Sequence, residues 1–232
     1  MHPVQNADGG SVLQTARNYP IDAATVIDAG AVVKLSGGKV VLAAAAETGG
    51  ILGIAAEFHS GTEDALNLRA NGTQILVCDN PTLIFECAAP TIKAASGSAT
   101  TLVPATGDVD ASAADDAFNN AVLVLREKAA SSTNTDALGT QIVVTDYAKT
   151  GTVMTKASGG VPGAGDVYEV YPVIGAAIGG VASLGDKRLG ITLKTVGATK
   201  LRCIGHDYER GTIKLVAIGH ALTWEGGKGN AS

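Results

Sequence analysis

The sequence predicts a mainly β protein: a small β-barrel or sandwich with an elaborated β-rich C-terminal portion and little helix. First, Ala, Gly, Val and Thr make up nearly half of the 232 residues. Second, short β-branched runs recur between glycine-containing turns, as in all-β domains. Third, no long stretch keeps the apolar period of a helix. With 46% hydrophobic and only 17% charged residues, the chain is too apolar for intrinsic disorder.

The first part of the chain predicts an arm followed by a barrel. Residues 1–18 are polar and aperiodic, so we expect an extended N-terminal arm that becomes ordered against a partner. Residues 19–92 predict a β-barrel-like domain. Its clearest element is a hairpin around Gly37-Gly38, because glycine readily adopts the positive φ angles of a tight turn. The strands expected in this domain are 31–35, 39–42, 51–55, 72–78 and 83–87.

The remainder predicts two further regions. Residues 93–165 are expected to form a loop-rich β region, in which 113–121 is compatible with one short helix. Residues 166–232 are expected to form a β-rich C-terminal portion, because charged and apolar side chains alternate there as in a sheet with one solvated face. The strands expected in these two regions are 121–128, 141–147, 167–173, 189–194, 200–204 and 212–218.

Charge is distributed unevenly along the chain. The net charge is −5, but residues 1–116 carry 5 basic and 13 acidic side chains, whereas residues 117–232 carry 12 and 9. A negative chain with few aromatic residues is a poor candidate for direct nucleic-acid binding. The basic cluster is expected to be either a solvated face or an interface with an acidic neighbour. Its candidate residues are Lys187, Arg188, Lys200, Arg202 and Arg210.

Catalytic and cofactor signals are sparse. The three cysteines have no metal-binding spacing, so we expect no metal or cofactor and reduced thiols. The adjacent pair His206-Asp207 belongs to the densest titratable cluster and offers a general base. The G-x-S-x-G nucleophile motif is absent, so we expect a turn at His206-Asp207 and no enzyme activity. Residues 170–185 are the longest uncharged stretch and are shorter than a membrane span, so no membrane partner is expected.

One segment carries a family resemblance. The phrases VIDAGAVVKLSGGKVVLA (26–43), GGILGIAAEF (49–58) and NGTQILVCDNPTLIFECAA (71–89) follow one another in the chain. In this order they resemble the head decoration, or capsid cement, proteins of tailed bacteriophages. The matching strands and glycine turns cover about a quarter of the chain, and the long C-terminal portion departs from compact members of that family.

The resemblance implies a non-enzymatic virion protein. It would be made in the host cytoplasm, bind the outer capsid surface as a homotrimer and stabilise the capsid by bridging major capsid protein subunits. The arm then supplies candidate capsid anchors, which are Val4, Val12, Leu13, Arg17 and Tyr19. The alternatives are another virion component, such as a fibre base, tail-tube or major capsid protein, or a β-barrel hydrolase that uses His206 and Asp207.

Overall fold

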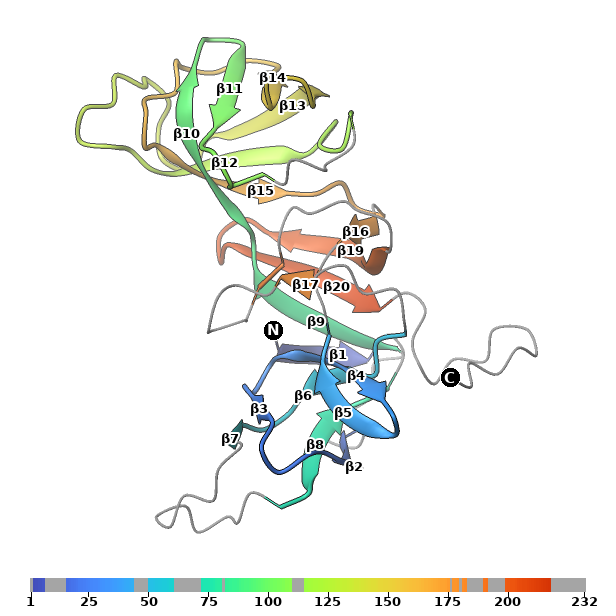
Figure 1. Cartoon of the computed structure of the whole chain (residues 1–232). Helices are drawn as coiled ribbons and strands as arrows, with labels where there is room; N and C mark the ends of the chain where they lie inside the picture. Colours follow the sequence, from blue (N-terminus) through green and yellow to red (C-terminus); the bar gives the residue numbers. More distant parts are fainter. Residues whose placement is uncertain are drawn as a thin grey trace.

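The protein is an all-β molecule made of three stacked units (Figure 1). The computed structural model describes residues 2–6, 16–43, 50–60, 72–80, 82–109, 115–175, 177–179, 181–182, 190–191 and 199–217. Within these ranges the chain forms strands and no helix, which confirms the predicted fold class. From one end to the other, the units are an N-terminal sheet, a central sheet and a closed barrel.

The N-terminal sheet has the strand order β2-β8-β6-β4-β5. Its strands are β2 (Ala16–Pro20), β4 (Val32–Ser36), β5 (Lys39–Leu42), β6 (Gly53–Ala55) and β8 (Gln74–Cys78). The predicted hairpin is β4–β5, and Gly37 and Gly38 at its turn have φ angles of 55° and 77°. Ile21 bridges Val40, so the sheet curls until its edge strands β2 and β5 approach each other. The curled face encloses an apolar core that includes Ile21, Ile27, Val33, Val40, Leu52, Ile75 and Val77.

A short two-stranded ribbon lies on one flank of this unit, at the left in Figure 1. It consists of β3 (Val26–Ile27) and β7 (His59–Ser60) in antiparallel pairing. Ile27 and His59 lie opposite each other and are buried. The ribbon is therefore attached to the core through one face only.

The central sheet joins the two ends of the described chain. Its order is β1-β9-β20-β19-β16, formed by β1 (His2–Asn6), β9 (Leu83–Ala88), β16 (Ala177–Gly179), β19 (Thr199–Asp207) and β20 (Thr212–Ala217). A separate pair, β17 (Val181–Ala182) with β18 (Gly190–Ile191), lies outside this sheet. Because β9 pairs with both β1 and β20, the sheet forms only when distant parts of the sequence meet.

The third unit is a closed six-stranded barrel with the order β10-β11-β14-β13-β12-β15. Its strands are β10 (Thr91–Gly97), β11 (Thr101–Pro104), β12 (Val122–Glu127), β13 (Gln141–Ala148), β14 (Val153–Lys156) and β15 (Val167–Tyr171). The interior is filled by apolar side chains, including Ile92, Leu102, Leu123, Leu125, Ile142, Val144, Met154 and Val170. The closed barrel is thus a packed core that leaves no free strand edge.

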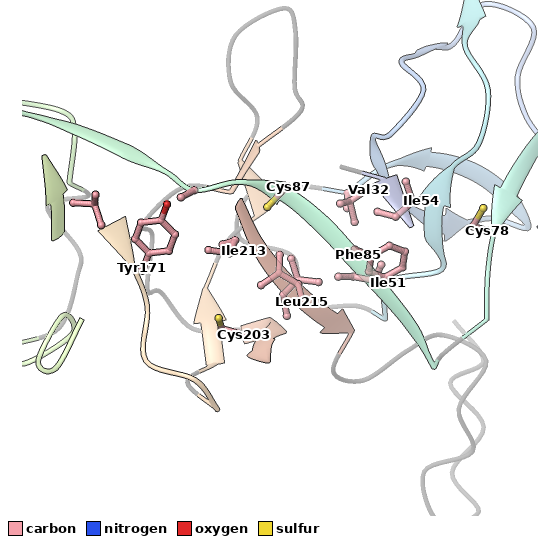
Figure 2. Close-up of a cluster of buried hydrophobic side chains, with 14 residues drawn as sticks. Val32, Ile51, Ile54, Cys78, Phe85, Cys87, Tyr171, Cys203, Ile213 and Leu215 are labelled. Atoms are coloured by element: carbon pink, nitrogen blue, oxygen red, sulfur yellow. The ribbon is translucent and has the colours of Figure 1, made fainter. Parts of the chain in front are cut away.

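A third apolar core lies between the units (Figure 2). Phe85 of β9 packs beside Ile51 and Ile54 of the N-terminal unit, and Leu215 of β20 lies on its other side. The same cluster continues to Tyr171, at the end of barrel strand β15. One continuous core therefore connects all three units and makes the body rigid.

The structure differs from the sequence-based expectations in three places. The closed barrel lies within residues 91–171, largely in the segment expected to be loop-rich, and residues 115–120 form turns rather than a helix. β10, β11 and β14 were not expected as strands because Ala, Ser and Thr weaken their apolar pattern. The described parts of residues 1–18 pair with β9 and β8, so they are strands of the chain's own sheets rather than a free arm.

Candidate interaction surfaces

The predicted capsid anchors do not form one surface. Val4 lies at a bulge of β1, and Val12 and Leu13 fall outside the described residues. The Tyr19 hydroxyl donates a hydrogen bond to Asp79, and Arg17 Nε lies 3.7 Å from the same carboxylate. Burial, followed by the hydrogen bond to Asp79, raises the pKa of Tyr19 to about 12. Tyr19 therefore helps to hold β2 in place, whereas the Arg17 side chain remains exposed.

The predicted basic face is divided in the structure. Arg202 is exposed on β19, whereas Arg210 lies in the β19–β20 turn with Nη1 3.5 Å from Glu86 Oε1. Thr212 Oγ1 also donates to Glu86, at 2.6 Å, so this buried carboxylate holds the turn against β9. Lys200 belongs to β19, but its side chain is outside the description, as are Lys187 and Arg188 entirely. Lys214 of β20 is exposed as well, which leaves Arg202 and Lys214 as the exposed described cations of this sheet face.

His206 and Asp207 do not act on each other. His206 Nε2 donates to Pro172 O at 2.6 Å, since a carbonyl can only accept, and Nδ1 lies 3.2 Å from the Tyr208 hydroxyl. Asp207 Oδ1 instead accepts the backbone N–H of Arg210 at 2.9 Å. The two side chains thus stabilise the end of β19 and the turn that follows it. The expected turn begins at Tyr208, because His206 and Asp207 still pair with Ile213 and Thr212 of β20.

A polar cluster at the junction between barrel and central sheet was missed by sequence reasoning. Arg126 Nε donates to Glu169 Oε2 at 2.6 Å, and Arg126 Nη2 donates to the Tyr171 hydroxyl and to Tyr208 O. Burial, followed by the hydrogen bond to Glu169, raises the pKa of Tyr171 to about 12. Arg126 connects barrel strands β12 and β15 to the β19–β20 turn. Its partners lie more than 40 residues away, so no local pattern could have indicated it.

A second polar cluster fixes the loops at one end of the barrel. Asp166 accepts hydrogen bonds from Ala129 N, Ser132 Oγ, Asn134 Nδ2 and Gly163 N at 2.9–3.1 Å. Burial alone would raise the pKa of Asp166, but these bonds outweigh it and lower that pKa. Nearby, Gly160 N donates to Asp136 Oδ2 at 2.8 Å. The β12–β13 loop and the segment between β14 and β15 are therefore tied together.

Several large apolar side chains are nevertheless exposed. Leu138 and Val161, on the two tied loops of the barrel end, are 62% and 46% exposed. Val26 and Phe58 lie at the β3–β7 ribbon, and Val173, Ile174 and Ile204 lie where the segment after β15 meets β19. Isolated exposed apolar residues are common, but grouped ones on fixed backbone mark contact surfaces.

Chemical sites are scarce in the part of the chain that is described. The three cysteines are free and buried, and burial raises the pKa of Cys87 to about 12, so these thiols serve as small apolar side chains. No group of three or more His, Cys, Asp or Glu among the described residues is arranged to hold a metal ion. Within the same ranges no helix has the length and apolar character needed to cross a bilayer.

Comparisons of the chain with family models, curated proteins and solved structures return no match.

Proposed function

We propose that the protein is a non-enzymatic component of a tailed-bacteriophage virion. It binds the outer surface of the capsid, as a homotrimer, and stabilises the capsid by bridging major capsid protein subunits. The proposal rests on the sequence resemblance of residues 26–89 to head decoration proteins. It places the protein on the virion exterior after synthesis in the host cytoplasm.

The observation that best supports a binding role is the exposure of apolar side chains on hydrogen-bonded loops at one end of the barrel. Leu138 and Val161 are exposed on loops whose backbone is held by the hydrogen bonds of Asp166 and Asp136. Loops that are fixed before binding lose little conformational entropy on contact, so their apolar side chains can contribute most of their burial energy. We assign the capsid-facing surface to this end of the barrel.

The rigid body fits a bridging function. The core shared by the three units transmits force from one end of the molecule to the other without an intervening flexible linker between the central sheet and the barrel. A protein that spans neighbouring subunits adds interface that must break before they separate, and a specific interface buries roughly 1,600 Å². Several copies bound together multiply this effect.

The hydrolase alternative receives no support from the described site. A general base must have its proton-accepting atom near a nucleophile, and another group must orient the base. His206 is instead oriented by Pro172 O and Tyr208, and Asp207 is committed to the turn.

Co-sedimentation with isolated phage heads tests the proposal. We expect the purified protein to bind expanded, mature heads and not unexpanded ones, and Leu138→Asp to reduce its occupancy at least tenfold. Leu35→Asp is the matched control, because Leu35 is also exposed but lies in the hairpin of the N-terminal sheet. Failure of the wild-type protein to bind either form of head would contradict the proposed function.

A further inference from the structure

We propose that copies of this chain contact one another head to tail, with the β3–β7 ribbon of one copy bound to the β19 face of the next. The knob consists of Val26 and Phe58 with the neighbouring carboxylate Asp28. The patch consists of Val173, Ile174 and Ile204 with the cations Arg202 and Lys214. The inference builds on the proposed function by assigning the surfaces through which copies associate.

The knob is an exposed apolar pair on a fixed support. Val26 pairs with Ser60, so Phe58, two residues earlier in the chain, is its diagonal neighbour on the same face. Val26 and Phe58 are 54% and 52% exposed, whereas the other two phenylalanines, Phe85 and Phe118, are buried. An exposed aromatic side chain beside a branched aliphatic one is typical of an interface anchor.

The side chain of His59 attaches the ribbon to the rest of the N-terminal unit. The buried His59 ring places Nδ1 2.6 Å from Thr25 O and Nε2 3.0 Å from Gly72 O. It thereby joins β7 to the turn before β3 and to the residues that lead into β8. The backbone that carries the knob is therefore fixed by these contacts, so little conformational entropy is lost when the knob binds.

The patch is assembled by the packing of a loop on a strand. Gly175 N donates to Cys203 O at 2.7 Å, so the segment that carries Val173 and Ile174 runs beside β19 at the point where Ile204 follows Cys203. All three side chains are exposed. At the bulge of β19, Ile204 and Gly205 lie across from Lys214 of β20, and Arg202 is two residues before Ile204. The patch is therefore apolar at its centre and positively charged at its rim.

Charge complementarity selects a second copy as the occupant. The knob has an apolar centre with Asp28 across the ribbon from Phe58, whereas the carboxylate of Glu57 is directed to Leu76 N of β8 at 2.9 Å. The patch has the same apolar character with cations at its rim. The acidic first half and the basic second half of the chain show the same asymmetry. Opposite charges around matched apolar centres favour this pairing over others.

The two surfaces cannot meet within one molecule. The ribbon lies on the outer flank of the N-terminal unit, whereas β19 lies in the central sheet and β15 in the barrel (Figure 1). The contact is therefore between copies and heterologous, because it joins different surfaces of the two partners. Heterologous contacts close into rings when the rotation between copies permits it.

Sedimentation velocity of the full-length protein with complementary variants tests the inference. We expect Phe58→Lys and Ile204→Asn each to raise the dissociation constant of self-association at least about 30-fold, which corresponds to the about 2 kcal/mol of a hot-spot residue. Melting temperatures equal to that of the wild type, measured at concentrations where the wild type is monomeric, establish that both variants are folded. Self-association of the wild-type protein should weaken from about 0.1 M to about 1 M salt, as the Debye length falls from about 10 Å to about 3 Å.

Mixing the two variants is the decisive step. The Ile204→Asn variant keeps an intact knob and the Phe58→Lys variant keeps an intact patch, so the mixture should regain one wild-type contact and form heterodimers. A monomeric wild-type protein, or a mixture that stays monomeric, would overturn the inference. Leu138→Asp is the control that separates it from the proposed function, since this variant should lose capsid binding and keep self-association.

Discussion

At the scale of single residues, the described structure is determined by buried polar groups that find their partners across the chain. Asp166 accepts hydrogen bonds from four donors on two loops. Glu86 accepts a hydrogen bond from Thr212 and forms an ion pair with Arg210. A buried carboxylate without such partners would cost several kcal/mol. Each of these residues therefore selects one loop conformation among many, which is what positions Leu138, Val161 and the β19–β20 turn.

Asp166→Asn should destabilise the protein by about 2–4 kcal/mol, because an amide cannot accept from all four donors and leaves buried N–H groups unpaired. The folded-state pKa of Asp166 is lowered. Its stabilisation is therefore present above the pKa of an unfolded Asp, about 4, and is lost as pH falls through the lower folded value. Chemical denaturation between pH 3 and 7 should show a flatter acid limb for the variant. The exposed Asp146→Asn serves as control and should match the wild type.

Gly53→Ala should disrupt the N-terminal sheet, because a Cβ at this position would lie 2.0 Å from the backbone oxygen of Cys78. Backbone cannot move aside as a flexible side chain can, so β6 and β8 would have to separate. We expect a loss of about 3 kcal/mol or more, measured by thermal denaturation. At Gly205 the nearest atoms are Lys214 side-chain carbons at 3.7 Å or more, so Gly205→Ala should be nearly neutral.

At the scale of elements, the long run of chain from β9 to β10 organises the molecule. β9 is in the central sheet, and the chain continues through Ala89 and Pro90 into β10 of the barrel (Figure 1). The two units therefore share a continuous backbone, and Arg126 adds a side-chain link between β12, β15 and the β19–β20 turn. This double connection orients the barrel end relative to the β19 face.

Arg126→Met should loosen this junction while leaving the barrel interior intact. The substitution keeps the apolar stem but removes the donor to Tyr208 O and one of the two donors to Glu169 Oε2, the other being the Tyr171 hydroxyl, at a cost of about 1–3 kcal/mol. Hydrogen exchange should accelerate in residues 207–212 and remain slow in β13 and β14. Lys149→Met, which alters an exposed cation in the turn between β13 and β14, is the control. Faster exchange throughout the barrel would instead show that Arg126 supports the barrel itself.

At the scale of the whole molecule, three cores coexist but only one is shared. The barrel and the N-terminal sheet each enclose their own cluster, and the third cluster connects both to the central sheet (Figure 2). The units are therefore expected to unfold together, because the loss of one exposes the apolar face of the next. Such cooperativity suits a protein that must resist force as one body.

Phe85→Ala should lower the stability of the entire chain by about 3–5 kcal/mol, the usual cost of emptying a buried phenylalanine site. Calorimetry should still show one transition, shifted to lower temperature. Phe58→Ala removes the same group from an exposed position and should change the melting temperature little. Two separated transitions in the Phe85 variant would contradict the shared core.

Part of this architecture was accessible to sequence reasoning. Glycine pairs at turns, β-branched runs and period-2 alternation predicted the all-β class, the β4–β5 hairpin and, among the later strands, β12, β13, β15, β19 and β20, since these signals are local. The candidate surfaces were predicted only in part: Arg202 is exposed as expected, but Arg210 is engaged with Glu86, and Tyr19 with Asp79. The partners of these side chains lie 60 or more residues away, beyond the reach of any local pattern.

The sequence by itself determined the fold class, the turn positions and the asymmetry of charge, because backbone preference and hydrophobic period act over a few residues. Only the tertiary structure decided which strands pair, that the barrel closes within residues 91–171, and that a core containing β9 side chains connects the three units. It also decided which apolar side chains stay exposed. These outcomes depend on contacts between distant segments, whose free energy is gained only when the whole chain is assembled.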